Sequence, residues 1–470
     1  MSYVCKILVV NFFLLALIAS HAAAQSVEAL LDKLIQKGVL TEKEAKDLKA
    51  ESITSDNTNQ VATSKWKFND SLKSIQLYGD LRFRYEARSA ENVAGSGGAG
   101  DSYLRERFRY AARVGIKGEL FDDFNFGFRL DTSSNPRSAW VSFGDDSSPA
   151  PFAKNSDGIN IGQVYLGWKP YPWFETTIGK MSQPLYTTAM VWDPDFSPEG
   201  IVERFKFEAW NVDFFGNFAQ FIYQDTNPDN AIPSSDTFML VFQAGAEVKL
   251  ADNVKTKVAP AFYAYTGVGQ SSGLNRTFTG QGFFGLNTNT APQFNNSGIN
   301  NLAILEVPAE INFTFDHYTL RLFGDFAYNF DGRERAQKAA EVGLLPASYE
   351  NETKAWMGGV SFGSSAPGFT SGTVSKKNTW EAKAYWQHVE QYSLDVNLLD
   401  SDFFEGRANL EGVYTALAYS LTDSIVATMR YGYANRINHN LDTGGTNPDL
   451  PVLNPIRNYH LVQLDLSYRF

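Results

Sequence analysis

The chain has 470 residues, with 52 acidic residues against 41 basic ones and a net charge of −11, a balance that argues against nucleic acid as a partner. Its one cysteine, Cys5, lies at the very start, so the rest of the chain forms no disulfide and offers no thiol chemistry. Phenylalanine and tyrosine are abundant, at 36 and 22 residues, and short segments alternate between apolar and polar residues. This composition is more typical of a membrane barrel than of a disulfide-stapled secreted domain.

Residues 1–24 predict a secretory signal peptide. Lys6 precedes an apolar stretch over residues 7–19, and small alanines lead to a cleavage site near Ala24 and Gln25. Beyond this segment no apolar run approaches the ~20 residues that a membrane helix needs. We therefore expect an exported protein without a membrane-spanning helix.

Residues 25–52 predict two short periplasmic helices. A helical stripe in the first is made of Leu30, Leu31, Leu34 and Ile35. Gly38 is a stop signal, and Thr41 with Glu44 forms a capping box for the second helix. The stripe has no partner within the segment, so it either packs on copies of itself in an oligomer, like a coiled coil, or belongs to a solubilising segment. Residues 53–74 are polar and predict a flexible linker.

From residue 75 to residue 470 the apolar pattern keeps a period of two, which predicts β-strands. In the first strand, one face holds Ile75, Leu77, Gly79, Leu81, Phe83, Tyr85 and Ala87. The other face holds Gln76, Tyr78, Asp80, Arg82, Arg84, Glu86 and Arg88. A soluble sandwich would alternate in the same way, so the alternation alone does not separate it from a membrane barrel.

The connections between strands separate the two folds. Tight turns are predicted at Asp122 and Asp123, at residues 170–173, at Asp252 and Asn253, at Asp316 and His317, and at residues 422–424. Long polar loops alternate with them at residues 89–102, 132–158, 183–200, 224–236, 266–301, 331–352, 391–409 and 437–457. Short turns on one side and long loops on the other predict an all-β transmembrane fold over residues 75–470, an antiparallel up-and-down β-barrel of about 16 strands.

Two places fit this pattern poorly. Residues 214–223 carry aromatic residues on both faces, so their register is not determined by the pattern. The connection over residues 364–378 is longer than the other turns on its side of the barrel.

The end of the chain predicts how the barrel closes and assembles. Residues 459–470 alternate strictly and finish on an aromatic residue, Phe470. In a closed barrel the last strand pairs with the first, so we expect Phe470 to lie in that seam and to act as the signal that the barrel-assembly machinery recognises. Aromatic residues also gather beside the short turns, where an interfacial girdle is expected.

Several motifs together resemble a known family. They are Lys37-Gly38-Val39-Leu40-Thr41, Trp192-Asp193-Pro194-Asp195, Ser197-Pro198-Glu199-Gly200, Trp380-Glu381-Ala382-Lys383-Ala384-Tyr385 and Gln463-Leu464-Asp465-Leu466-Ser467. In their order they resemble the putative-porin family of Gram-negative bacteria. The resemblance implies an outer-membrane channel, commonly a homotrimer, with outer-membrane lipids and small hydrophilic solutes as its partners. It supplies no particular solute.

Arginines dominate the polar face of the first two strands, and this face is expected to line the pore. They are Arg82, Arg84, Arg88, Arg105, Arg107, Arg109 and Arg113. Like charges opposite each other in a hairpin cost up to ~1 kcal/mol per pair, so anions or carboxylates, or simply water in a wide lumen, are expected to compensate them. In a wet lumen each such ion pair is expected to contribute little to stability.

The third long loop, residues 183–200, carries the acids that suit this role. Asp193, Asp195 and Glu199 lie beside apolar residues and prolines, which is unusual for an exposed loop. Such a loop needs a wall to pack on. We expect it either to fold into the barrel, where it narrows the pore and places its acids across from the arginines, or to contact a neighbouring subunit.

An enzyme is not expected. The chain beyond the signal has four histidines, none beside a serine in a strained turn, and it has no metal-ligand cluster. We predict no cofactor and no metal. The expected function is passive diffusion of small hydrophilic solutes through a barrel narrowed by the third loop. The alternatives are a channel selective for anions or sugars, and a plugged structural or adhesin barrel.

Overall fold

The computed structural model describes residues 71–92, 102–133, 138–144, 158–224, 237–267, 302–341, 351–364, 376–441, 443 and 455–470. The predicted signal peptide, the predicted helices of residues 25–52 and most of the predicted linker lie outside the described residues. Within the described part of the chain, no helix is long and apolar enough to cross a membrane.

The described residues form nineteen strand segments and one helix. The first ten segments are β1 (Leu72–Asn92), β2 (Ser102–Leu120), β3 (Phe124–Thr132), β4 (Val141–Ser142), β5 (Ile159–Tyr171), β6 (Phe174–Lys180), β7 (Glu199–Ala209), β8 (Val212–Gln224), β9 (Thr237–Ala251) and β10 (Val254–Val258). The others are β11 (Ala261–Gly267), β12 (Ala303–Glu306), β13 (Ala309–Phe315), β14 (Tyr318–Asn329), β15 (Lys354–Gly363), β16 (Trp380–Val389), β17 (Leu410–Ser420), β18 (Ile425–Arg436) and β19 (Ile456–Arg469), and the helix is α4 (Gly332–Glu341).

These segments make sixteen strands of one antiparallel barrel. β10 and β11 both pair with β9 and are two parts of one strand, and β12 and β13 are likewise two parts of the strand beside β14. The interruptions contain Pro260 and Pro308, which have no backbone N–H to donate to the ladder. β4 is a two-residue segment that pairs with β2 beyond the end of β3. The predicted strand number is therefore confirmed.

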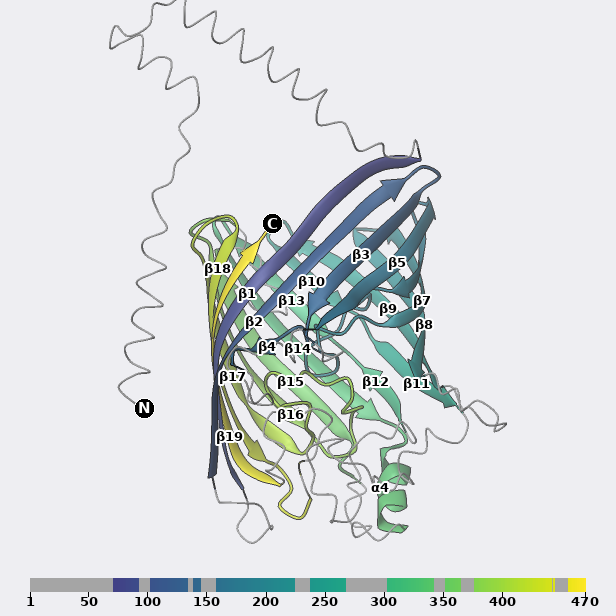
Figure 1. Ribbon diagram of the computed structural model, residues 1–470. Coiled ribbons are helices and arrows are strands. Elements are labelled where there is room, and N and C mark those ends of the chain that lie inside the picture. The colour runs from purple at the N-terminus through teal and green to yellow at the C-terminus, as the bar shows by residue number, and fades with distance from the viewer. Residues whose placement is uncertain are drawn as a thin grey trace, which may run out of the picture. The chain divides into compact units, whose positions relative to one another are not determined.

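The barrel closes between its first and last strands (Figure 1). β1 pairs with β19 from Asp80 opposite Arg469 to Asn92 opposite Ile456. Beyond this register, Gly79 and Phe470 exchange backbone hydrogen bonds of 3.0 and 3.1 Å. Phe470 thus lies in the closing seam, as the alternation of the last strand predicts.

The predicted short turns are confirmed, whereas the sixth predicted long loop, residues 331–352, contains the helix α4. All five predicted tight turns connect neighbouring strands, and a sixth, Trp210 and Asn211, was not predicted. Trp210 and Asn211 both have positive φ, 52° and 64°, as the central residues of a type I′ hairpin turn do. Tryptophan is a poor indicator of such a turn, which explains why the sequence did not reveal it. At the long connection, the Ser364 N–H donates to the Trp380 carbonyl at 2.9 Å, and residues 365–375 lie outside the described part.

The outer surface of the barrel is apolar. Large side chains such as Leu77, Phe207 and Ile159 are more than half exposed, and aromatic residues beside the short turns stack in pairs, Tyr171 on Trp173 at 5.4 Å and Phe124 on Trp168 at 5.9 Å. An exposed apolar surface of this extent requires apolar surroundings. The buried hydrophobic cluster lies inside the barrel, between the strands and two long loops.

Candidate functional site

The third long loop, residues 181–198 between β6 and β7, folds into the barrel. Its apolar residues Leu185, Met190, Val191 and Trp192 are buried. Trp192 meets Phe221 of β8 edge to face, with ring centroids 5.8 Å apart. This contact also resolves the uncertain register of residues 214–223, because Phe221 points inward and covers the loop while Phe214 and Phe218 stack on the outward face. Sequence reasoning anticipated the inward course of this loop.

Hydrogen bonds to the barrel wall hold the loop. The Gln243 amide of β9 donates to the Tyr186 carbonyl at 2.8 Å and accepts from the Tyr186 N–H at 2.9 Å. The Thr187 hydroxyl donates to Glu306 at 2.6 Å, and the Thr188 hydroxyl donates to Asp325 at 2.5 Å. The loop therefore spans from β6 across the interior to the wall formed by β9, β12 and β14.

A second loop, residues 390–409 between β16 and β17, also folds inward and was not expected to do so. Its apolar residues Leu394, Val396, Leu399, Phe403 and Phe404 are buried in the cluster that contains Trp192. This is the seventh long loop in chain order. Its sequence carries the same signal as the third loop, an apolar content too high for a solvated segment.

The two loops are joined inside the barrel at Asp193. The Asp193 N–H donates to the Leu398 carbonyl at 2.6 Å, and one Asp193 carboxylate oxygen accepts from the backbone N–H and the hydroxyl of Ser401, at 3.2 and 3.1 Å. Burial, and then the neighbouring Asp400, raise the pKa of Asp193 well above its usual value. Burial and the nearby Asp402 raise the pKa of Asp400 to about 7. We call this junction the loop clasp.

Asp195 of the third loop binds an arginine of β2. Its carboxylate accepts a hydrogen bond of 2.6 Å from Arg113. Burial alone would raise the pKa of Asp195, but Arg113 and Arg82 outweigh it and hold this pKa below its usual range. Asp195 is therefore an anion fixed opposite the strand arginines.

The arginines of the first two strands lie together around an acid that sequence reasoning did not select, Glu86 of β1. Glu86 is fully buried and pairs with Arg107 at 2.5 Å, with Arg88 at 3.1 Å, and with Arg84 and Arg109 at 3.7 Å. We call these five residues the Glu86 cluster. The expectation of exposed pairs in a wet lumen does not hold for Glu86, which is fully buried. Trp140 lies over Arg84 and Arg109, and the seventh loop contacts Arg84 and Arg88. Arg88 also donates to the Asp402 carbonyl at 3.1 Å and so holds the seventh loop.

Two predicted residues lie apart from this group. Glu199 begins β7, is largely exposed, and pairs with Lys180 at 3.0 Å. It does not line the cavity described below, but it lines a second cavity together with Asp195 and Arg113. Arg105 has the inward phase of β2 but does not line the cavity described next.

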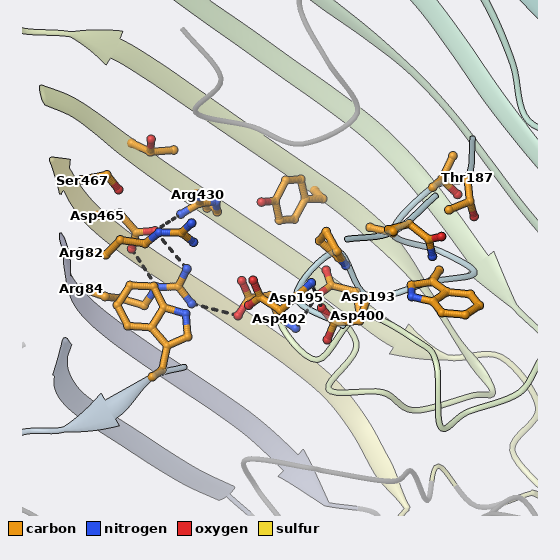
Figure 2. A pocket seen from close by; sticks show the side chains of 18 of the residues that line it. Arg82, Arg84, Thr187, Asp193, Asp195, Asp400, Asp402, Arg430, Asp465 and Ser467 are labelled. Carbon is orange, nitrogen blue, oxygen red and sulfur yellow. Dashed lines mark hydrogen bonds and ion pairs between the residues drawn. The ribbon is translucent and has the colours of Figure 1, made fainter. Parts of the chain in front are cut away.

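A cavity of about 460 Å³ lies between the two loops and the wall formed by β1, β18 and β19 (Figure 2). Asp193, Asp195, Asp400 and Asp402 line it from the loops, and Arg82, Arg84, Arg430, Arg469 and Asp465 line it from the strands. Arg84 makes a two-point pair with Asp465, at 2.8 and 3.0 Å, and a third bond of 2.9 Å with Asp402. Arg430 also pairs with Asp465, and the Arg84 guanidinium lies 4.2 Å from the centre of the Trp140 ring. We call this space the central cavity.

A closed barrel with an apolar outer face and charged, loop-narrowed interior defines a membrane channel of the porin type. The family model described as "Putative porin" matches residues 100–312 and 287–470, and the chain belongs to this family. Family and fold together imply an outer-membrane channel.

Solved porins are similar to this chain in fold at low sequence identity. OprB of Pseudomonas putida, in a high-pH structure, is 12% identical, with 85% of this chain and 94% of that chain covered and a TM-score of 0.47. OmpF of Salmonella typhi in complex with daunomycin is 10% identical, with 86% and 99% covered and a TM-score of 0.45. A mutant of the Rh. blastica porin is 10% identical, with 84% and 100% covered and a TM-score of 0.38. No curated protein matches the chain.

Proposed function

We propose that the protein is a porin through which small hydrophilic solutes diffuse passively, and that the third and seventh loops together narrow its water-filled passage. The observation that carries this proposal is the position of the third loop between two cavities. The central cavity of about 460 Å³ lies on one side of the loop, and a cavity of about 900 Å³ lies on the other. Both are lined by Gln183, Leu185 and Tyr186, so the passage runs past this part of the loop.

The charges beside the loop suit a selective passage. Acids from the two loops are opposed to arginines from β1 and β18. Opposed rows of fixed charge produce a transverse field, which favours polar and dipolar solutes over apolar ones. The proposed constriction therefore uses Asp195 as the sequence predicts, with Asp402 from the seventh loop in place of Glu199.

The remaining sequence-based expectations complete the proposal. The signal peptide of residues 1–24 is removed near Ala24 and Gln25, the helices of residues 25–52 help to join three copies, and Phe470 directs assembly. N-terminal sequencing of the mature protein tests the cleavage. Light scattering in mild detergent, with and without residues 25–60, tests the trimer and the role of the helices.

Single-channel recording in a planar bilayer tests the proposed passage. We expect the purified protein to conduct, and we expect removal of residues 187–196 to raise its conductance about twofold or more, because conduction is limited where the loop narrows the path. Removal of residues 275–290, in another long loop, is the control and should leave conductance unchanged. A silent wild-type barrel would favour the plugged, structural alternative, and unchanged conductance after the first deletion would show that the third loop does not limit passage.

A further inference from the structure

Six charged side chains that line the central cavity are partly exposed, and Arg82, Asp195 and Asp402 are three of them. The side chains of Arg82, Asp195 and Asp402 are 27%, 27% and 29% exposed. Arg84 and Asp465, in the same cavity, are 3% and 5% exposed. Arg84 and Asp465 are buried in their ion pair, whereas Arg82, Asp195 and Asp402 are accessible to a solute in the cavity. Asp400, Arg430 and Arg469 are partly exposed there as well, so arginines still face the solute from the strands and acids from the loops.

Arg82, Asp195 and Asp402 are each held in place by a partner. Arg82 pairs with Asp80 at 2.5 Å, and Asp195 pairs with Arg113 at 2.6 Å. Asp402 accepts hydrogen bonds from Arg84 and from Gln463, at 2.9 and 3.0 Å. These partners keep the acids from collapsing onto Arg82, so that a cationic and two anionic positions face the same space. Figure 2 shows Arg82 on the strand side of the cavity and Asp195 and Asp402 on the loop side.

The size and the walls of the cavity suit a small organic solute. Its volume of about 460 Å³ lies in the range of ligand pockets, ~300–1,000 Å³. Tyr385 and Tyr414 line it as a stacked pair, with ring centroids 4.8 Å apart, and Thr428 and Ser467 add hydroxyl groups. The wall therefore offers an apolar surface and hydrogen-bonding groups between the two sets of charge.

We propose that the central cavity is a binding site for a small zwitterionic solute, whose cationic group lies toward Asp195 and Asp402 and whose anionic group lies toward Arg82. This inference rests on the proposed function, because the solute must enter from the passage. A solute with one charge is attracted by one side of the cavity and repelled by the other. A neutral sugar gains from neither side, whereas a zwitterion gains from both.

Four probes of similar size separate these solutes. Glycylglycine carries both charges, its N-acetyl derivative carries only the negative charge, its amide carries only the positive charge, and glucose carries none. Each is added to single channels in a planar bilayer, and the concentration that gives half-maximal interruption of the current is measured. We expect glycylglycine to act at a concentration about fivefold lower than the other three, a difference of ~1 kcal/mol.

Variants assign this preference to the named residues. Arg82→Gln should remove the preference for glycylglycine because it removes the partner of the anionic group. The double variant Asp195→Asn with Asp402→Asn should remove it because it removes the partners of the cationic group. Glu199→Gln and Lys180→Gln, outside the central cavity, are matched controls and should keep it. The mobility shift on heating in electrophoresis verifies that each variant is folded.

The outcomes distinguish the inference from the proposed function. If the channels conduct but glucose or the N-acetyl derivative interrupts the current as effectively as glycylglycine, the zwitterion site is overturned and the porin function stands. The same holds if the channels conduct and no probe interrupts the current. If the control variants also lose the preference for glycylglycine, the preference does not come from Arg82, Asp195 and Asp402. Silent channels would overturn the porin itself.

Discussion

The Glu86 cluster and the exposed charges of the central cavity use the same residue types and lie side by side, yet water reaches only one of them. Glu86 is fully buried among four arginines, whereas Arg82, Asp195 and Asp402 keep more than a quarter of each side chain exposed. A buried charge that loses its partner is strongly destabilising, whereas an exposed pair contributes ~0–1 kcal/mol. Arginines on the inward face of β1 and β2 therefore have different roles according to their burial. The buried ones stabilise the fold, and the partly exposed Arg82 is available to a solute.

The largest expected effect follows from neutralising the buried acid of the Glu86 cluster. Glu86→Gln leaves Arg84, Arg88, Arg107 and Arg109 without their common acid, and breaking a buried pair of this kind costs ~3–5 kcal/mol. We expect far less folded, inserted protein, measured as the heat-modifiable band in electrophoresis. Glu199→Gln, which removes an exposed acid of equal charge, should insert normally. Equal yields for the two variants would mean that water reaches the Glu86 cluster.

A second prediction concerns the seam that holds the cluster's strand in the barrel. A Cβ at Gly79 would lie 2.3 Å from the Arg113 carbonyl oxygen and 2.7 Å from the Phe470 ring. We expect Gly79→Val to lower the free energy of unfolding by ~1–3 kcal/mol, as overpacking does, measured by urea titration in detergent micelles. At Gly358 of β15 nothing lies within 4 Å, so Gly358→Val is the matched control. If both variants behave alike, the closing seam is looser than the contacts indicate.

A third, smaller effect concerns the loop clasp, which joins the third loop to the seventh loop. In the opened loops Asp400 would titrate near its ordinary value of 3.8, whereas in the clasp its pKa is about 7, and that of Asp193 is raised as well. Between pH ~4 and ~7 the opened loops therefore hold fewer protons than the clasp, and the clasp loses stability as the pH rises through this window. Above pH ~7 no further loss is expected from Asp400. Asp195, with its lowered pKa, acts in the opposite sense only at more acidic pH.

Fluctuations of the single-channel current test whether the clasp loses stability as the pH rises. We expect loop opening, seen as current noise, to be about twofold or more greater at pH 8 than at pH 5, and Asp400→Asn to reduce the difference, because an amide does not ionise. The Asn side chain can still accept the 3.0 Å hydrogen bond from the Asp402 N–H. Noise that decreases with rising pH, or that changes equally in the variant, would contradict the role of the clasp.

The fold could be predicted from the sequence because the outer face of the barrel follows a strict period of two. Turn chemistry then located five of the six tight turns, and only Trp210 escaped, since a tryptophan at positive φ is no turn signal. The inward course of the third loop could be predicted as well, because apolar residues such as Met190 and Trp192, both buried, are unusual in an exposed loop. These features depend on local patterns of residues, and such patterns are visible in a single sequence.

The rest of the site depends on which residues meet across the interior, and local pattern does not carry that information. Glu86 shares the inward phase of the arginines, but its central position follows from the pairing of β1 with β2 and from the loops that bury it. Glu199 is close to Asp195 in sequence, but the chain enters β7 between them, so Glu199 pairs with Lys180 instead. Asp402 lies more than two hundred residues from Asp195, and only the packing of the two loops brings both to one cavity.

The reversal potential under a tenfold salt gradient tests most directly whether the exposed charges of the central cavity control passage. The scale is ~59 mV for ideal selectivity toward a monovalent ion. We predict that Asp195→Asn with Asp402→Asn shifts the potential toward anion selectivity by ~10 mV, that Arg82→Gln shifts it toward cation selectivity, and that Glu199→Gln leaves it unchanged, all with normal insertion. Wild-type potentials in both cavity variants, or an equal shift in Glu199→Gln, would contradict the account.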